Sequence, residues 1–204
     1  MHKGFNFDSF FGKYAQYFGV KGLPGVEYDE NRGTLFPNIG GESFLSFGYG
    51  HSQIASLLFK IVIHATEKLV LIPVDTVLPN DDPNILILEE PETNLHPKLQ
   101  SQLANLFADV RSKFNTQFLI ETHSEYMVRK FQYLVAKGEM KPEDIVIHYF
   151  HDPNNIPAGE PQVKKITILE DGSLSDDFGA GFYDEAANLE LELLRLKRNK
   201  SRQN

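Results

Sequence analysis

The sequence predicts an α/β fold in which a mostly parallel sheet is covered by helices. Two short apolar runs, at 85–88 and 117–121, each lead into a segment whose apolar residues recur at helical spacing. Strands that alternate with amphipathic helices are typical of parallel sheets. The composition agrees, because 204 residues with 41% hydrophobic and 24% charged side chains suffice for one globular domain.

Residues 1–45 are predicted to form an aromatic-rich N-terminal segment built on a β-hairpin. The hairpin strands lie at 26–28 and 34–36, and turns are expected at 31–33 and 38–41. No helical period is sustained, so we expect strands and turns here and no helix. The segment could equally be a frayed start, because turn-rich termini are often poorly ordered. A cluster of aromatic residues could stack on bases, but we favour packing against a partner or another lobe; its members are Phe5, Phe7, Phe10, Phe11, Tyr14, Tyr17 and Phe18.

Residues 46–170 are predicted to hold the main α/β region. A helix over 51–66 comes first, followed by a strand-like run at 69–74 and a polar loop over 75–84. The run at 85–88 is apolar without alternation. That pattern is typical of a strand buried on both faces of a parallel sheet.

Further strands and helices complete this region. Pro97 is suited to the first turn of a helix that follows the strand at 85–88. Ser124 can cap another helix directly after the strand at 117–121. The remaining β-structure is expected at 145–150 and 163–169.

Residues 171–204 are expected to form a C-terminal helix over 185–198 with a solvated basic tail. Over the whole chain, 20 Lys and Arg against 28 Asp and Glu leave a net charge of −8, which disfavours a broad nucleic-acid-binding face without excluding a local one. The absence of cysteine excludes disulfides, thiolate zinc sites and cysteine nucleophiles. With no membrane-length apolar run and no signal peptide, we expect a cytoplasmic protein that makes no membrane contact.

The strongest chemical signal is the run ILILEEPETNLHP at 85–97. Its apolar strand delivers Glu89 and Glu90 to the carboxyl edge of the sheet, where ligands bind in open α/β folds. Successive strand residues point in opposite directions, so the two carboxylates can hold separate tasks. One can bind Mg²⁺ through oxygen, and the other can polarise a water for attack on phosphorus.

Two weaker signals accompany it. In FLIETHS, His123 follows a second apolar strand and could donate a hydrogen bond to a phosphate near neutral pH. In SFGYGHSQ, Gly48 and Gly50 precede Ser52 and Gln53 at the start of a helix. Helix N-termini bind anions, and glycine allows a phosphate to approach closely.

In this order the three runs resemble the C-terminal lobe of an ABC-type ATPase head. They are most similar to the RecF/SMC-like and OLD-like bacterial ATPases, and to AAA-type ATPases whose C-terminal region is catalogued as a domain of unknown function. The resemblance covers about 45–185 and is strongest over 85–125. It implies a P-loop NTPase fold that uses ATP and Mg²⁺ and works as a dimer of heads.

The resemblance also implies roles for individual residues. Glu89 corresponds to the Walker B carboxylate that holds Mg²⁺, Glu90 to the catalytic carboxylate and His123 to the switch histidine. The signature that contacts ATP on a partner head comprises Gly48, Gly50, Ser52 and Gln53, with Ser46 as an alternative signature serine. The D-loop, which contacts the partner head, corresponds to Asn94, Leu95 and His96.

The sequence departs from this family in one respect, because it contains no GxxxxGK[ST] phosphate-binding motif. We therefore expect half of an ATPase, inactive by itself, whose partner is a second head or a lobe that bears Walker A. An effector protein is a further expected partner, and the family suggests phage defence or DNA repair.

Two alternative functions remain. The chain could be a non-catalytic interaction fragment, or one subunit of a split ATPase. It could also be a metal-dependent nuclease whose site is formed by Glu89, Glu90, Glu92, His96 and His123.

Overall fold

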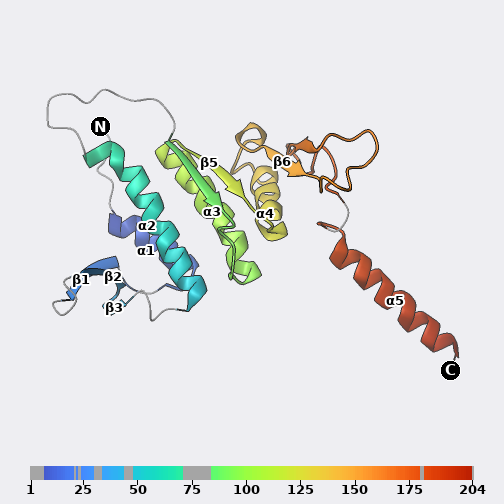
Figure 1. The fold of residues 1–204 in the computed structure, drawn as a ribbon, viewed down its shortest axis with the longest axis horizontal. Coiled ribbons are helices and arrows are strands. Elements are labelled where there is room, and N and C mark those ends of the chain that lie inside the picture. The colour runs from blue at the N-terminus through green and yellow to red at the C-terminus, as the bar shows by residue number, and fades with distance from the viewer. Residues whose placement is uncertain are drawn as a thin grey trace. The chain divides into compact units, whose positions relative to one another are not determined.

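The computed structural model in Figure 1 describes residues 7–20, 22, 24–29, 34–43, 48–70, 84–179 and 182–203. The chain forms two compact units, residues 1–130 and 131–204. The elements of the first unit are α1 (Phe7–Tyr17), β1 (Pro24–Asp29), β2 (Thr34–Ile39), β3 (Glu42–Ser43), α2 (Tyr49–Val70), β4 (Asn84–Glu89), α3 (Pro97–Phe114) and β5 (Thr116–Glu121), followed by α4 (Glu125–Ala136), which runs into the second unit.

The predicted hairpin is confirmed, because β1 and β2 pair antiparallel from Pro24 opposite Ile39 to Asp29 opposite Thr34. The expected turn at 31–33 lies outside the described residues. The second turn is also confirmed: Gly40 and Gly41, with φ of 60° and 83°, join β2 to β3. Glycine suits a turn that needs two successive positive φ angles.

The α/β class is confirmed by the parallel pairing of β4 with β5. Leu88 is buried on one face of this pair, and Phe118 on the same face packs on Phe107 of α3 with ring centroids 4.9 Å apart. The other face is exposed at Ile85, Ile87 and Leu119, which retain 56–65% of their accessible surface. The expectation of burial on both faces is therefore wrong for the described residues, since α3 covers the Phe118 face.

The aromatic N-terminus forms helix α1, which contradicts the expectation that this segment has no helix. Phe10, Phe11 and Tyr14 are buried in the unit itself. Phe11 packs on Phe59 of α2 at 5.6 Å, and Phe10 packs edge-on against Phe114 of α3 at 5.7 Å. Phe10 and Phe11 therefore join α1 to two helices of the same chain, contrary to the expected packing on a partner or another lobe. Phe5 and the side chain of Phe7 lie outside the described residues.

An ionic contact reinforces the same packing. Lys13 of α1 and Lys113 of α3 each lie 2.8 Å from Asp109 of α3. Partial burial of Asp109 opposes ionisation, but hydrogen bonds from Lys113 and Lys13 outweigh it and lower the pKa of the carboxyl. The contact therefore stabilises the fold above the ordinary pKa of aspartate and is lost as the pH falls through the lowered value.

The helix predicted at 51–66 is confirmed as α2, which extends to Val70. The expected strand at 69–74 therefore begins inside this helix, and its remainder lies outside the described residues. Pro97 begins α3 as predicted. Ser124 caps α4, since its Oγ accepts a hydrogen bond from the Met127 amide at 3.1 Å.

The second unit contains a 3₁₀ turn η2 (Pro142–Asp144), strands β6 (Ile147–Phe150) and β7 (Val163–Ile166), and helix α5 (Glu185–Gln203). The two strands pair antiparallel in a sheet of their own. Tyr149, Phe178 and Phe182 pack with centroid distances of 4.9 to 6.5 Å. Tyr149 of β6 therefore packs against the aromatic rings of the segment before α5.

None of the helices in the described ranges is both long enough and apolar enough to cross a bilayer.

We expect Phe11→Ala to destabilise the first unit by about 3–5 kcal/mol, because it removes a fully buried aromatic ring between α1 and α2. Urea unfolding followed by circular dichroism measures the effect. Tyr17→Ala is the matched control, since Tyr17 lies on the same helix and is 48% exposed. Equal unfolding midpoints for the two variants would show that α1 is not packed as described.

Candidate functional site

The glutamate pair lies where β4 ends. Glu89 is opposite Glu121, the last residue of β5, and the Glu90 amide donates to the Glu121 carbonyl at 3.0 Å. Glu90 itself has φ of 42°, a left-handed conformation that costs a non-glycine residue roughly 1–3 kcal/mol. The chain therefore turns sharply at Glu90, directly after the last paired residue of β4.

The Glu90 carboxylate has one hydrogen bond and one nearby imidazole. Thr93 Oγ1 donates to Glu90 Oε2 at 2.9 Å, and His123 Nε2 lies 3.6 Å from Glu90 Oε1. The second distance is too long for a hydrogen bond but allows a charge interaction. Because the side chains of Glu90 and His123 are 50% and 73% exposed, both can reach a ligand. The structure thus brings together two of the residues that the sequence suggests.

Glu92 connects the loop after β4 to the loop after β5. It is only 6% exposed, and its Oε1 accepts hydrogen bonds from Thr122 Oγ1 and from the His123 amide, both at 2.7 Å. Hydrogen bonds to a buried carboxylate are strong. Sequence reasoning considered Glu92 only as a nuclease ligand and missed this contact, which fixes the backbone of His123.

Gln100 of α3 adds a second connection between the same loops. Its Nε2 donates to the Leu95 carbonyl at 3.0 Å, and its Oε1 accepts from Ser124 Oγ at 2.6 Å. His96 caps α3, with its Nδ1 accepting from the Lys98 amide at 3.3 Å. The expected D-loop residues Leu95 and His96 therefore hold structural positions here.

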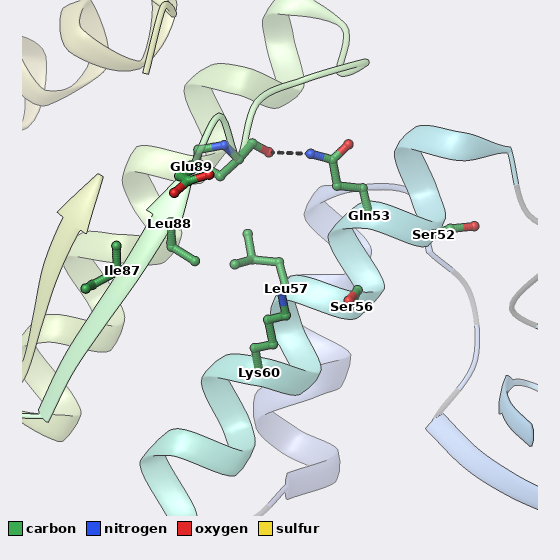
Figure 2. A pocket seen from close by; sticks show the side chains of 9 residues that line it. Ser52, Gln53, Ser56, Leu57, Lys60, Ile87, Leu88 and Glu89 are labelled. Atoms are coloured by element: carbon green, nitrogen blue, oxygen red, sulfur yellow. Dashed lines mark hydrogen bonds between the residues drawn. The ribbon is translucent and has the colours of Figure 1, made fainter. Parts of the chain in front are cut away.

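The start of α2 packs on the loop that follows β4. A Cβ atom added at Gly50 would lie 2.9 Å from the Asn94 carbonyl oxygen, so only glycine fits this contact unchanged. Gln53 Nε2 lies 3.4 Å from the Glu90 carbonyl and 3.5 Å from the Pro91 carbonyl. Figure 2 shows this amide reaching from α2 toward the end of β4. The start of α2 and the loop after β4 are thus neighbours in one chain.

The other residues expected in the signature are Gly48, directly before α2, and Ser52, in its first turn. Ser52 is half-buried, and its Oγ lies 3.5 Å from the Gly48 carbonyl. Gly48 is exposed. The alternative signature serine, Ser46, lies outside the described residues.

Two open cavities border these groups. One, of about 310 Å³, is lined by Gln53, Glu89, Glu90, Thr93 and Glu121. The other, of about 590 Å³, lies between α2 and β4 and includes Lys60, whose side chain is labelled in Figure 2. Sequence reasoning assigned no role to Glu121 or Lys60. Glu121 is the last residue of its strand, as Glu89 is of β4. This shared position in the sequence could have indicated that Glu121 lies beside Glu89.

The donor set at the end of β4 fits Mg²⁺. Glu89 presents an exposed carboxylate, the hard oxygen ligand that this ion prefers. Among the described residues, no three His, Asp or Glu side chains are grouped to enclose a metal. Mg²⁺ at nucleotide sites is commonly held by one or two carboxylates together with phosphates and water.

Two protein-family models match parts of the chain. The AAA ATPase domain family matches residues 44–128, and a protein family of unknown function, DUF3696, matches residues 140–193. These matches confirm the resemblance to an ABC/AAA-type ATPase lobe. They cover the glutamate pair, His123 and the described signature residues.

Curated relatives are ATP-binding proteins of transport systems. The methionine import ATP-binding protein MetN 2 of Oceanobacillus iheyensis is 24% identical over 47% of this chain and 29% of its own length. The dipeptide transport ATP-binding protein DppD of Lactococcus lactis subsp. cremoris is 31% identical over 36% of this chain and 22% of its own length. The chain thus spans less than a third of the relatives it matches.

A solved structure is similar over a greater length. It comes from work on ATP-driven dimerization and DNA-stimulated activation of SMC ATPases. The similarity covers 93% of this chain and 89% of that one, with 13% identity and a TM-score of 0.46.

We expect Gly50→Ala to destabilise the first unit by about 1–3 kcal/mol, because the added Cβ meets the Asn94 carbonyl. Gly48→Ala is the matched control, since a Cβ there meets nothing within 4 Å. Urea unfolding compares the two. A helix normally gains stability from Gly→Ala, so a more stable Gly50→Ala variant would contradict the contact.

We expect Glu92→Ala to leave the His123 amide without its acceptor, at a cost of roughly 1–3 kcal/mol. Hydrogen exchange of that amide should accelerate roughly tenfold for each 1.4 kcal/mol lost. Glu92→Gln retains an acceptor oxygen and should restore much of the protection. Glu125→Ala, which removes the half-buried partner of the exposed Arg129, should leave this amide unchanged. Unchanged exchange in Glu92→Ala would refute the connection.

Proposed function

We propose that this chain is an ATP-hydrolysing domain of a head-dimerising bacterial ATPase. It supplies the Walker B carboxylate, the catalytic carboxylate, the switch histidine and the signature. The observation that supports this most directly is the placement of His123 Nε2 3.6 Å from Glu90 Oε1, at the ends of two parallel strands. The ATPase family match over residues 44–128 gives the same reaction class.

Glu90 is the proposed general base. Its Oε2 is occupied by Thr93, while its Oε1 faces His123 and can accept a proton from a water molecule. The left-handed backbone at Glu90 and the Thr93 hydrogen bond fix the carboxylate before ATP arrives. Fixed groups cost no reorganisation during the reaction, which is how positioned charges accelerate phosphoryl transfer.

His123 is the proposed sensor of the γ-phosphate. Its exposed imidazole can donate a hydrogen bond to a phosphate oxygen, while Glu92 holds its backbone amide. Glu89 is the proposed Mg²⁺ ligand, and the bound ion would neutralise developing charge on the phosphates. These roles place one Mg²⁺ ligand, one general base and one phosphate sensor at a single sheet edge.

A second ATPase head is the proposed partner. The signature residues Gly48, Gly50, Ser52 and Gln53 would contact ATP held by that head. The phosphate-binding lysine is proposed to come from outside these 204 residues, since they contain no GxxxxGK[ST] motif. Calorimetry with Mg-ATP tests this division, with Glu89→Ala as the control. Micromolar binding by the purified chain that is lost in the control would show that the chain has its own phosphate site.

We expect Glu90→Gln, in an assembly that contains a Walker A head, to retain ATP and to lower turnover by about 10²- to 10⁴-fold, because the amide cannot accept the proton. Glu143→Gln, an exposed carboxylate in η2, is the control and should hydrolyse ATP normally. Phosphate release and retained nucleotide are measured together. Normal turnover in Glu90→Gln would place the catalytic base elsewhere.

His123→Ala should reduce turnover more than it reduces ATP binding, since a phosphate sensor acts after the nucleotide is bound. The same phosphate-release assay, run beside a nucleotide-binding titration, separates the two effects. An unchanged rate would return His123 to a structural role.

A further inference from the structure

Helix α5, drawn in red in Figure 1, has an unusual surface. Every side chain described for Glu185–Lys200 is exposed. Its five leucines each retain 52–58% of their accessible surface; they are Leu189, Leu191, Leu193, Leu194 and Leu196. Most helices in proteins owe their stability to packing of an apolar face, so a helix with five exposed leucines indicates an interaction surface.

Three of these leucines form a seam. Leu189, Leu193 and Leu196 follow one another at spacings of four and three residues, which places them on one face of the helix. Alternating spacings of this kind are those of the a and d positions of a coiled coil. Leu191 and Leu194 lie outside the seam.

Charge is distributed unequally along the helix. The first half carries Glu185, Glu190 and Glu192, and the second half carries Arg195, Lys197, Arg198, Lys200 and Arg202. Glu190 directly follows the seam residue Leu189, and Lys197 directly follows Leu196. One end of the seam is therefore flanked by a negatively charged side chain and the other end by a positively charged one.

We propose that α5 pairs with α5 of a second copy of this chain in an antiparallel coiled coil. In this arrangement Leu193 faces Leu196 of the second copy, and Glu190 lies beside Lys197 of the second copy. The contact repeats itself by symmetry, as an isologous dimer requires. Leu189 packs along the aliphatic stem of Lys200 of the second copy.

A parallel pair matches this charge pattern less well. The same seam would then place Glu190 beside Glu185 of the second copy, which offsets the attraction between Glu192 and Lys197 of the second copy. The two Lys200 side chains would also meet at one a position. Like charges at these positions disfavour pairing. The complementarity of the acidic and basic halves therefore selects the antiparallel dimer, which needs no nucleotide and does not depend on the proposed ATPase function.

Light scattering of the purified full chain without nucleotide tests the proposal. We expect twice the 23.2 kDa mass of one chain at micromolar concentration. Leu193→Asp/Leu196→Asp should raise the dissociation constant at least about 100-fold, since two charges enter the seam. Leu191→Asp/Leu194→Asp, the control with equal charge, should remain a dimer. Circular dichroism confirms that both variants keep their fold.

Three results would overturn the proposal. The first is a monomer at these concentrations, as expected if α5 docks on its own chain. The others are a dimer that persists in Leu193→Asp/Leu196→Asp, and an equal loss of dimer in both double variants.

Cysteine cross-linking tests the orientation, since the chain has no cysteine of its own. A mixture of Leu189→Cys and Lys200→Cys chains should form a mixed disulfide. Leu189→Cys alone should not, because the two Cα positions are offset along the antiparallel pair by about 16 Å at 1.5 Å per residue. Efficient cross-linking of Leu189→Cys with itself would instead establish the parallel pair and refute the antiparallel one.

Discussion

The geometry of the candidate site depends on one buried carboxylate. The parallel pairing of β4 and β5 brings the two loops that follow them to the same sheet edge, but strand pairing alone does not fix loop conformation. Glu92 fixes it, because this residue of the loop after β4 accepts hydrogen bonds from Thr122 Oγ1 and the His123 amide in the loop after β5. The distance between Glu90 and His123 is therefore set by backbone contacts as well as by the two exposed side chains.

Helices α2 and α3 hold the same loop from outside. Gln100 of α3 binds the Leu95 carbonyl, and Gly50 of α2 allows close contact with Asn94. The aromatic side chains of α1 pack against both of these helices. Helix α1 is thus part of the support of the site, although none of its described side chains lines the two cavities.

The sequence predicts the part of the fold that local signals specify. The apolar run of β4, Pro97 at the start of α3 and the Ser124 cap each act within a few residues, and the structure confirms all three. Helix α1 is not predicted, because the helical period of its buried residues at positions 10, 11, 14 and 18 spans too few residues to stand out within the aromatic-rich segment 1–45. The burial of Glu92 has no local signal, since a glutamate is rarely buried and its partners lie 30 and 31 residues away.

The two proposals concern different surfaces of the chain. The proposed head pairing would use Gly48, Ser52 and the end of β4 in the first unit, and it would form around ATP. The proposed pairing through α5 would use residues of the second unit and would form without ATP. A tether of the second kind would raise the effective concentration of one head at another to roughly millimolar, provided that the connecting segment can span the two sites. A weak, nucleotide-dependent contact between heads could then form and separate in each cycle without the two chains dissociating.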